Sequence, residues 1–455
     1  MEKKGGSEKW EEFKKARNKY IRILRDEERN YEKDIVNKCK DEPKLFFRYV
    51  NGKMKNKQTI DKLTKDDITY EDTRLQAELM NKCFQSVFTK ESKFEGERAW
   101  HRDNVMREIQ VDISEIKKIM KDLDVSKAQG PDGVSNWILK ECCEQLAEGI
   151  HNTIVCSFKE GKIPLDWKRA NIVPIFKGGN KEDPLNYRPV SLTSVVAKIA
   201  ERIVKNRWME YLEETHTLTD RQFGFRSGRS CVTNLVSFYS RAIDIIQERE
   251  GWADCVYLDL KKAFDKVPHQ RLLWKIKNIG GLQGNTLNWI TDFLRDREMR
   301  TVIKGEKSEW CRVTSGVPQG TVLAPVMFLV YVNDMVDEVD SYISLFADDA
   351  KLLKGVENNM DCEILQKDLN KIYKWSKKWE MEFNAKKCKV MELGKSKRRL
   401  TSSYTMGEVE IKKTKEEKDL GITISDNLSP EKHVNKIVGE TYELLRKMKG
   451  AFAYI

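Results

Sequence analysis

Cys255-Val-Tyr-Leu-Asp259 is one of two stretches that decide the fold, and Ile343-Ser-Leu-Phe-Ala-Asp-Asp349 is the other. Each apolar run is too short for a helix and predicts a buried strand that ends in carboxylates. Because successive strand residues point to opposite faces, Asp348 and Asp349 cannot both point inward from a regular strand. They are therefore predicted to lie at a hairpin turn, with Asp348 as the more direct ligand of whatever neutralises them.

Three acids at neighbouring strand ends predict a site for cations. Like charges about 4 Å apart repel by about 4 kcal/mol in a dielectric of about 20. Divalent cations with oxygen ligands relieve that repulsion, and two of them about 3.5–4 Å apart are typical of in-line phosphoryl transfer. An isolated Asp-Asp pair is more often a solvated turn. Here the apolar run before the pair and the second acid-tipped strand favour the metal site.

The composition suits a nucleic-acid partner. The chain has 455 residues, 40% apolar and 34% charged, and its 83 Lys and Arg exceed its 72 acids, which gives a net charge of +11. This length predicts about three domains. A basic excess with many aromatic side chains suits a phosphate backbone and stackable bases, and it equally suits a soluble basic protein without such a partner.

The sequence argues against zinc, disulfides and membranes. Its ten cysteines form no C-x-x-C pair and its five histidines are scattered, so reduced thiols are expected. No stretch approaches the roughly 20 apolar residues of a membrane span. The charged start, Met1-Glu-Lys-Lys-Gly-Gly6, lacks the apolar region of a secretory signal. We expect an intracellular protein, in the nucleus or the cytoplasm, with no membrane partner.

Helix and strand signals are interleaved without strict alternation, which predicts an α+β fold. Apolar residues at helical spacing predict one long helix over 8–40, as an amphipathic support or as a basic arm that touches RNA. A helix capped by Ser114 is expected from residue 113, and a single helix over 137–159. The turn signal of residues 316–320 opens an apolar helix over 323–336.

Six motifs follow one another in a fixed order. They are Lys127-Ala-Gln-Gly-Pro-Asp-Gly133, Asn186-Tyr-Arg-Pro-Val-Ser-Leu192, Gln222-Phe-Gly-Phe-Arg226, Leu258-Asp-Leu-Lys-Lys-Ala-Phe-Asp265, Gly316-Val-Pro-Gln-Gly-Thr-Val-Leu-Ala-Pro325 and Phe346-Ala-Asp-Asp349. In this order they resemble the reverse transcriptases of non-LTR retrotransposons, the LINE-type elements of animals. Each motif alone is weak evidence, whereas six in the order of the family are specific.

The resemblance implies a right-hand polymerase with an antiparallel palm sheet flanked by helices. The fingers are expected over 105–230, the palm over 231–395 and a partial thumb over 396–455, after a helical N-terminal extension over 1–104. The implied activity is RNA-directed DNA synthesis on an RNA template with a DNA primer and dNTPs. Protein partners stay open.

The resemblance makes Asp259 and Asp348 ligands of two Mg²⁺ ions, with Mn²⁺ as a possible substitute. Asp349 lies beside them, and the backbone carbonyl of Leu260 completes one metal shell. The ions would activate the primer 3′-hydroxyl and hold the triphosphate, so no protein base is needed for the attack. Lys387 is implied as the proton donor to the leaving pyrophosphate, although the adjacent Lys386 is equally basic.

The remaining implied residues bind nucleotide and template. Lys177 and Arg188 contact the triphosphate, or are solvated loop charges. Phe264 lies under the sugar and excludes a 2′-hydroxyl, or is an ordinary core residue. The turn Pro318-Gln319-Gly320 is implied to pack against the template base and the nucleotide. Four further residues are implied to line the template path, namely Arg226, Arg229, Phe223 and Phe225.

Two rival functions stay open. The chain could be a non-catalytic RNA-binding remnant, or an RNA-directed RNA polymerase. The intact acids and the turn at residues 318–320 argue against the remnant, and Phe264 argues against both. Phe346 stands where many relatives have Tyr, which removes a hydroxyl and keeps the ring. No endonuclease sequence precedes the motifs and no Cys/His knuckle follows them, so we expect a fragment, a degenerate copy or a host-retained reading frame.

Overall fold

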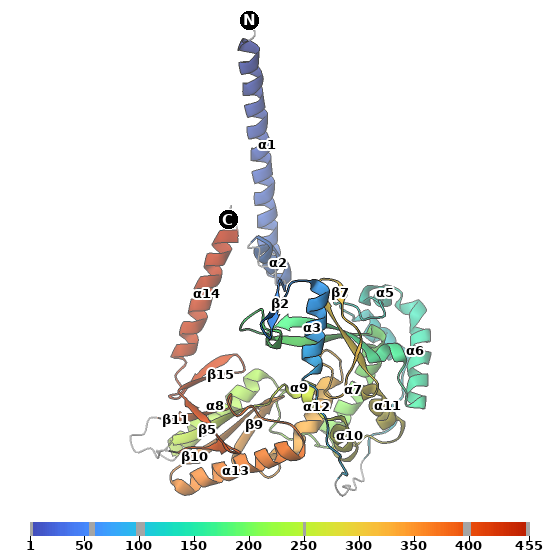
Figure 1. Cartoon of the computed structure of the whole chain (residues 1–455), viewed down its shortest axis with the longest axis vertical. Helices are drawn as coiled ribbons and strands as arrows, with labels where there is room; N and C mark the ends of the chain where they lie inside the picture. Colours follow the sequence, from blue (N-terminus) through green and yellow to red (C-terminus); the bar gives the residue numbers. More distant parts are fainter. Residues whose placement is uncertain (1–2, 54–59, 97–104, 249–251, 395–401, 452–455) are drawn as a thin grey trace. The chain divides into compact units, whose positions relative to one another are not determined.

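A computed structural model describes residues 3–53, 60–96, 105–248, 252–394 and 402–451 (Figure 1). The chain forms two compact units, one of Met1–Thr59 with Pro430–Ile455 and one of Ile60–Ser429. The described elements mix helices and sheets, as the sequence predicted. In those ranges, no helix is both long and apolar enough to cross a membrane.

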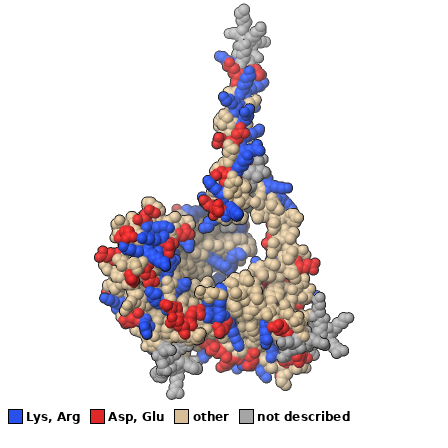
Figure 2. Space-filling view, turned by 180° about the vertical axis from the view of Figure 1, so that it is seen from behind, with Lys and Arg blue, Asp and Glu red and all other residues tan. Residues whose placement is uncertain are grey.

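The smaller unit is helical. It contains α1 (Lys3–Lys38), α2 (Pro43–Lys53) and α14 (Glu431–Ala451). The long N-terminal helix is therefore confirmed. Ile35 of α1 is fully buried beside Phe46 and Val50 of α2, whereas Trp10 and Tyr20 are more than half exposed. On the face shown in Figure 2, Lys and Arg are interspersed with Asp and Glu along α1.

The larger unit contains helices around two sheets. They are α3 (Thr73–Gln85), α4 (Ile113–Lys121), α5 (Asn136–Glu141), α6 (Cys143–Glu160), α7 (Val195–Glu214), α8 (Cys231–Glu248), α9 (Ala263–Lys266), α10 (His269–Asn278), α11 (Gly284–Leu294), α12 (Ala324–Val332) and α13 (Asn359–Lys378). Short two-stranded ribbons join β1 (Leu63–Lys65) to β2 (Ile68–Tyr70), β12 (Thr405–Met406) to β13 (Val409–Glu410), and β15 (Glu416–Asp419) to β16 (Ile422–Ser425).

A five-stranded sheet holds both acid-tipped strands. Its order is β14 (Lys412–Thr414), β11 (Lys389–Leu393), β5 (Trp252–Asp259), β10 (Asp349–Val356) and β9 (Tyr342–Phe346). β5 pairs antiparallel with β10 and β11, and β9 pairs antiparallel with β10, whereas the edge pair of β11 and β14 is parallel. Cys255 packs with Phe238 of α8, while Val256 and Leu258 join the core of α12 and α13. Alternate side chains of β5 thus pack into two different hydrophobic cores.

The second sheet has the order β4 (Tyr187–Thr193), β3 (Arg169–Phe176), β6 (Glu298–Ile303) and β7 (Glu306–Lys307), with β8 (Cys311–Arg312) beside β6. β3 and β6 are parallel, and the other pairs are antiparallel. Met80 and Phe84 of α3 share a core with Ile172 of β3 and Met299 of β6. Residues of both sheets line the cleft in which the predicted site residues meet.

Two predicted helices differ from the structure. The cap of α4 is Asp112, whose carboxylate accepts a hydrogen bond from the Ser114 N–H at 2.8 Å, so the prediction of Ser114 as the cap is wrong. The single helix predicted over 137–159 is interrupted at Cys142, where α5 ends and α6 begins. Both differences are local. The helices were predicted from the spacing of their apolar residues, and this spacing does not show which residue caps a helix or where a helix is interrupted.

Candidate active site

The predicted hairpin turn lies between β9 and β10 and holds Asp348. Phe346 ends β9, Asp349 begins β10, and Ala347 has a left-handed backbone with a φ of 56°. Asp349 lies opposite Asp259 in the pairing of β10 with β5. The three predicted acids therefore come from one end of the central sheet.

Gln222 supports this turn from a neighbouring loop. Its buried side-chain carbonyl accepts hydrogen bonds from the Ala347 N–H at 3.0 Å and from the Gly224 N–H at 2.8 Å. A Cβ atom at Gly224 would lie 2.5 Å from the Ala347 nitrogen, so only glycine allows the two chains to approach this closely. The sequence placed Gln222 in a motif without giving it a role.

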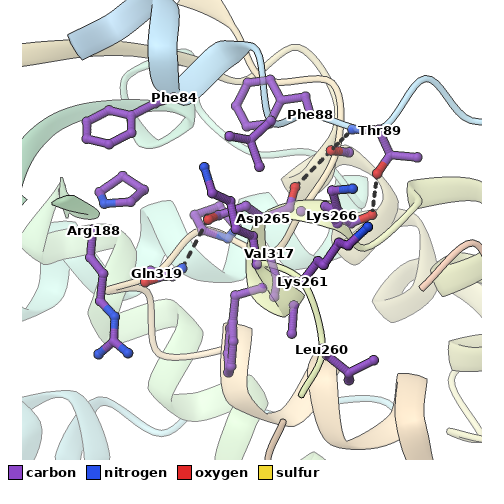
Figure 3. Close-up of a pocket in the computed structure, with 18 of the residues that line it drawn as sticks. Phe84, Phe88, Thr89, Arg188, Leu260, Lys261, Asp265, Lys266, Val317 and Gln319 are labelled. Carbon is purple, nitrogen blue, oxygen red and sulfur yellow. Dashed lines mark hydrogen bonds between the residues drawn. The ribbon is translucent and has the colours of Figure 1, made fainter. Parts of the chain in front are cut away.

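A cleft of about 1050 Å³ lies beside the hairpin. Nine predicted site residues line it, namely Lys177, Arg188, Asp259, Leu260, Phe264, Pro318, Gln319, Asp348 and Lys387. Figure 3 shows part of it, with Arg188 and Leu260 on different sides of Asp265. Asp349 lines a second cavity of about 340 Å³, which Asp259 also borders. The cleft thus gathers most of the predicted site in one place.

The acids in the cleft fit a hard cation. Burial raises the pKa of Asp259 and that of Asp348, and the Lys387 charge opposes the change at Asp259. Over the described ranges, no three His, Cys, Asp or Glu side chains are grouped closely enough to hold a metal. The expected cluster of three acids is therefore a pair in the cleft, because Asp349 faces the neighbouring cavity. Such a pair fits Mg²⁺, which commonly takes one or two carboxylates together with water and substrate phosphates.

Cations converge on another wall of the same cleft. Lys177 follows β3 and Arg188 lies in β4, and the two segments are joined by a hydrogen bond from the Lys177 N–H to the Asn186 carbonyl at 3.0 Å. Burial lowers the pKa of Lys177, and the charges of Lys387 and Arg188 lower it further. Three positive groups that repel one another in this way are suited to a bound polyanion.

Phe264 belongs both to the lining of the cleft and to the aromatic packing beside it. Its ring lines the cleft and also stacks on Phe328 of α12, with ring centroids 4.5 Å apart and an interplanar angle of 14°. Phe225 meets the same ring edge-on at 6.3 Å. The stacked core contact holds the ring in place in the cleft wall.

The turn at residues 316–320 packs against two backbones. Gly316 has a φ of 87°, and a Cβ atom there would lie 2.6 Å from the Asp265 carbonyl oxygen. Gly320 has a φ of 109°, and its Cβ atom would lie 2.5 Å from the Ser191 carbonyl oxygen of β4. Gly320 does not line the cleft, so the close approach that it permits is to Ser191.

Asp265 is a site residue that the sequence did not single out. Its carboxylate accepts a hydrogen bond from Gln319 Nε2 at 3.1 Å and lines the cleft (Figure 3). Burial raises its pKa to about 6, although Lys262 and Gln319 favour its charged form. The available signal was its position directly after Phe264 within a quoted motif.

Glu201 holds the other end of the same turn. This fully buried carboxylate of α7 accepts hydrogen bonds from the Val322 N–H at 2.6 Å and the Leu323 N–H at 3.2 Å, just before α12. It therefore satisfies backbone donors at the start of an apolar helix. Burial raises its pKa, and the nearby Arg297 charge opposes that change.

The choice of Lys387 over Lys386 is favoured by position, since Lys387 lines the cleft and Lys386 lines only the smaller cavity. The prediction that Arg226 lines the template path is wrong. Its side chain is 6% exposed and forms an ion pair with Glu213 at 2.5 Å. Arg229 binds Asp220 and lies over the Phe223 ring, 5.1 Å from its centroid.

Comparison with known proteins defines the class. Residues 179–424 match the family described as reverse transcriptase (RNA-dependent DNA polymerase). The chain belongs to this family, which confirms the resemblance noted from its motifs.

Its relatives are named for insect mobile elements. The RNA-directed DNA polymerase from mobile element jockey of Drosophila melanogaster is 29% identical over 72% of this chain and 36% of its own length. The probable RNA-directed DNA polymerase from transposon BS of the same species is 28% identical over 74% of this chain and 38% of its own length. The Pol polyprotein from retrotransposable element R2 of Nasonia vitripennis is 27% identical over 64% and 29%. The chain thus matches between 29% and 38% of the length of these relatives.

Proposed function

We propose that this chain is an RNA-directed DNA polymerase that adds dNTPs to a primer 3′-hydroxyl, with an RNA template, a DNA primer and Mg²⁺. One observation carries the proposal. Asp259 and Asp348, from two adjoining segments of the central sheet, line one cleft together with Lys177, Arg188 and Phe264. Nucleotidyl transfer requires carboxylates that bind metal ions and basic side chains that bind the triphosphate. The aromatic ring provides a surface for the sugar.

Asp259, Asp348 and the Leu260 carbonyl would hold the metal ions. When bound, Mg²⁺ lowers the pKa of the attacking hydroxyl and neutralises charge on the phosphates. Two carboxylates are enough for this purpose, since Mg²⁺ completes its shell with water and substrate oxygens. The raised pKa values of Asp259 and Asp348 fit this assignment, because a cation would restore the charged form that burial disfavours.

The other residues of the cleft bind and orient the nucleotide. Lys177 and Arg188 contact its triphosphate, and the Phe264 ring lies under its sugar. The primer hydroxyl gives up its proton to solvent, and its oxygen forms a bond to the α-phosphorus while the bond to the bridging oxygen breaks. Lys387 supplies a proton to the departing pyrophosphate. Gln319, held by Asp265, lies against the nucleotide and template base.

We assign residues 105–230 to fingers, 231–395 to a palm, 396–455 to a partial thumb and 1–104 to an N-terminal extension. The antiparallel core of the five-stranded sheet and the position of its acids support the palm. The two compact units cut across these boundaries, since residues 60–104 belong to the larger unit and 430–455 to the smaller one.

Primer extension on an RNA template tests the proposal. The purified chain should extend a labelled DNA primer with dNTPs and Mg²⁺, extend it poorly with rNTPs, and stop when the metal is chelated. A folded chain that binds the RNA and never extends the primer would instead be a non-catalytic RNA-binding remnant. Extension with rNTPs alone would identify an RNA polymerase.

A further inference from the structure

Residues 84–94, here called the strap, contribute to the lining of the cleft although they precede both the family match and the six motifs. The strap residues that line the cleft are Phe84, Ser86, Val87, Phe88, Thr89 and Lys90. Figure 3 shows Phe84 and Phe88 on the side of the cavity opposite Leu260, with Asp265 between. A wall of the proposed nucleotide site therefore comes from the segment expected to be a separate extension.

The first part of the strap is tied to the turn beneath Gln319. The Thr89 N–H donates to Ser315 Oγ at 2.8 Å, and the Thr89 hydroxyl donates to the Lys266 carbonyl at 2.8 Å. Ser315 in turn donates to the Asp265 carbonyl at 2.9 Å. Thr89 is thus joined directly to the backbone that places Phe264 and Asp265 in the cleft.

The second part is anchored in a buried ion pair and an aromatic cluster. Glu91 binds Arg271 of α10 at 3.0 Å, and the two side chains are 11% and 6% exposed. The Arg271 guanidinium lies 4.8 Å from the centroid of the Phe94 ring, which also meets Trp274 and Trp379. Two anchors on either side of Lys90 fix its backbone at the edge of the cleft.

Lys90 is an exposed cation without an acidic partner. No hydrogen bond or ion pair engages its ammonium group anywhere in the described ranges. Lys261 and Lys266, on the adjoining wall, are different, because both bind Glu382, at 3.4 and 3.2 Å. A cation whose backbone is anchored at the edge of a cleft, and whose charge has no acidic partner among the described residues, is suited to a phosphate.

We propose that the strap forms one wall of the nucleotide site and that Lys90 binds the triphosphate of the incoming nucleotide. This inference rests on the proposed function, since it takes the cleft to be the nucleotide site. A lysine ammonium acts as a point charge and needs no fixed geometry, which suits a triphosphate that enters and leaves at every cycle. The strap would then contribute to the KM for every dNTP alike.

Lys93 provides a matched control on the same strap. It is 87% exposed, pairs with Glu95 at 2.8 Å and does not line the cleft. In the full chain, Lys90→Ala should raise the KM for dNTPs about five- to tenfold, with kcat and primer–template affinity changed less than about twofold. Lys93→Ala removes the same charge and should leave the KM within about twofold of wild type.

A chemical footprint tests the same contact without turnover. The unmodified chain is bound to an RNA template and a dideoxy-terminated primer, and acetylation of each lysine by an amine-reactive ester is followed by mass spectrometry. A saturating complementary dNTP should slow acetylation of Lys90 at least threefold and leave Lys93 unchanged. Equal labelling of Lys90 with and without dNTP, in a chain that extends primers, would overturn this inference alone. A chain that neither extends primers nor responds to dNTP would overturn the proposed function and this inference with it.

Discussion

Replacing Asp265 with Asn should stabilise the fold and weaken catalysis. Burial raises the pKa of Asp265 from 3.8 to about 6. Each pKa unit corresponds to about 1.4 kcal/mol, so the ionised carboxylate costs the fold about 3 kcal/mol, and about 2 kcal/mol once residual solvent screening is allowed for. Because the folded pKa lies above the unfolded one, this cost is absent below about pH 4, grows between pH 4 and 6, and is complete above pH 6.

Urea unfolding of the full chain at two pH values measures this effect. At pH 7.5 the free energy of unfolding of Asp265→Asn should exceed that of wild type by about 2 kcal/mol, and near pH 4 the two should agree. The kcat/KM for dNTPs should fall several-fold at pH 7.5, because an amide is a weaker acceptor than a carboxylate for Gln319 Nε2 and can also turn its NH₂ group toward it. Asp340→Asn is the control, since that side chain is 71% exposed. A variant less stable than wild type at pH 7.5, or one of unchanged activity, would refute this reasoning.

Three further outcomes are expected. Phe264→Val should lower the kcat/KM ratio of dNTP over rNTP at least about tenfold while dNTP incorporation continues, and an unchanged ratio in an active variant would make Phe264 a core residue only. Gly316→Ala should cost at least about 2 kcal/mol of stability and most of the activity. The control Gly133→Ala should cost about 1 kcal/mol, because Gly133 also has a positive φ, 73°, but nothing lies within 4 Å of a Cβ atom there. Equal melting temperatures for the two variants would contradict the close packing at Gly316. Primer–template affinity should weaken at least about tenfold between 50 and 200 mM salt through counterion release, and a salt-independent Kd would exclude a phosphate-dominated interface.

The hairpin that holds Asp348 was predictable because its evidence is local. The apolar run before Asp348 and Asp349 has the length of a strand, and the alternation of strand side chains required a turn at the pair. In the structure, Asp259 and Asp349 at the ends of these short segments lie opposite each other in the pairing of β5 with β10. Family motifs supplied the residues of the proposed metal and nucleotide site, of which all but Gly320 and Asp349 line the cleft.

The supporting residues could not be predicted, because their partners are distant in the sequence. Thr89 and Lys266 are 177 positions apart, and Glu201 and Val322 are 121 apart. No periodicity relates such pairs, and each residue alone is an ordinary polar side chain. The prediction for Arg226 was wrong for a related reason. The sequence of a glycine-rich loop is the same whether its Arg faces nucleic acid or is buried against Glu213.

The most direct test of the central claim is RNA-templated primer extension by Asp348→Ala beside Asp340→Ala. Both substitutions remove one carboxylate from the region of β9, but Asp348 lines the cleft, and Asp340 is exposed and pairs with Lys371 at 3.0 Å. With Mg²⁺ and dNTPs, Asp348→Ala should lose at least about a thousandfold in rate while its circular dichroism and melting temperature stay those of a folded chain, and Asp340→Ala should extend primers like wild type. Wild-type rates in folded Asp348→Ala would contradict the assignment of this cleft as the site of DNA synthesis.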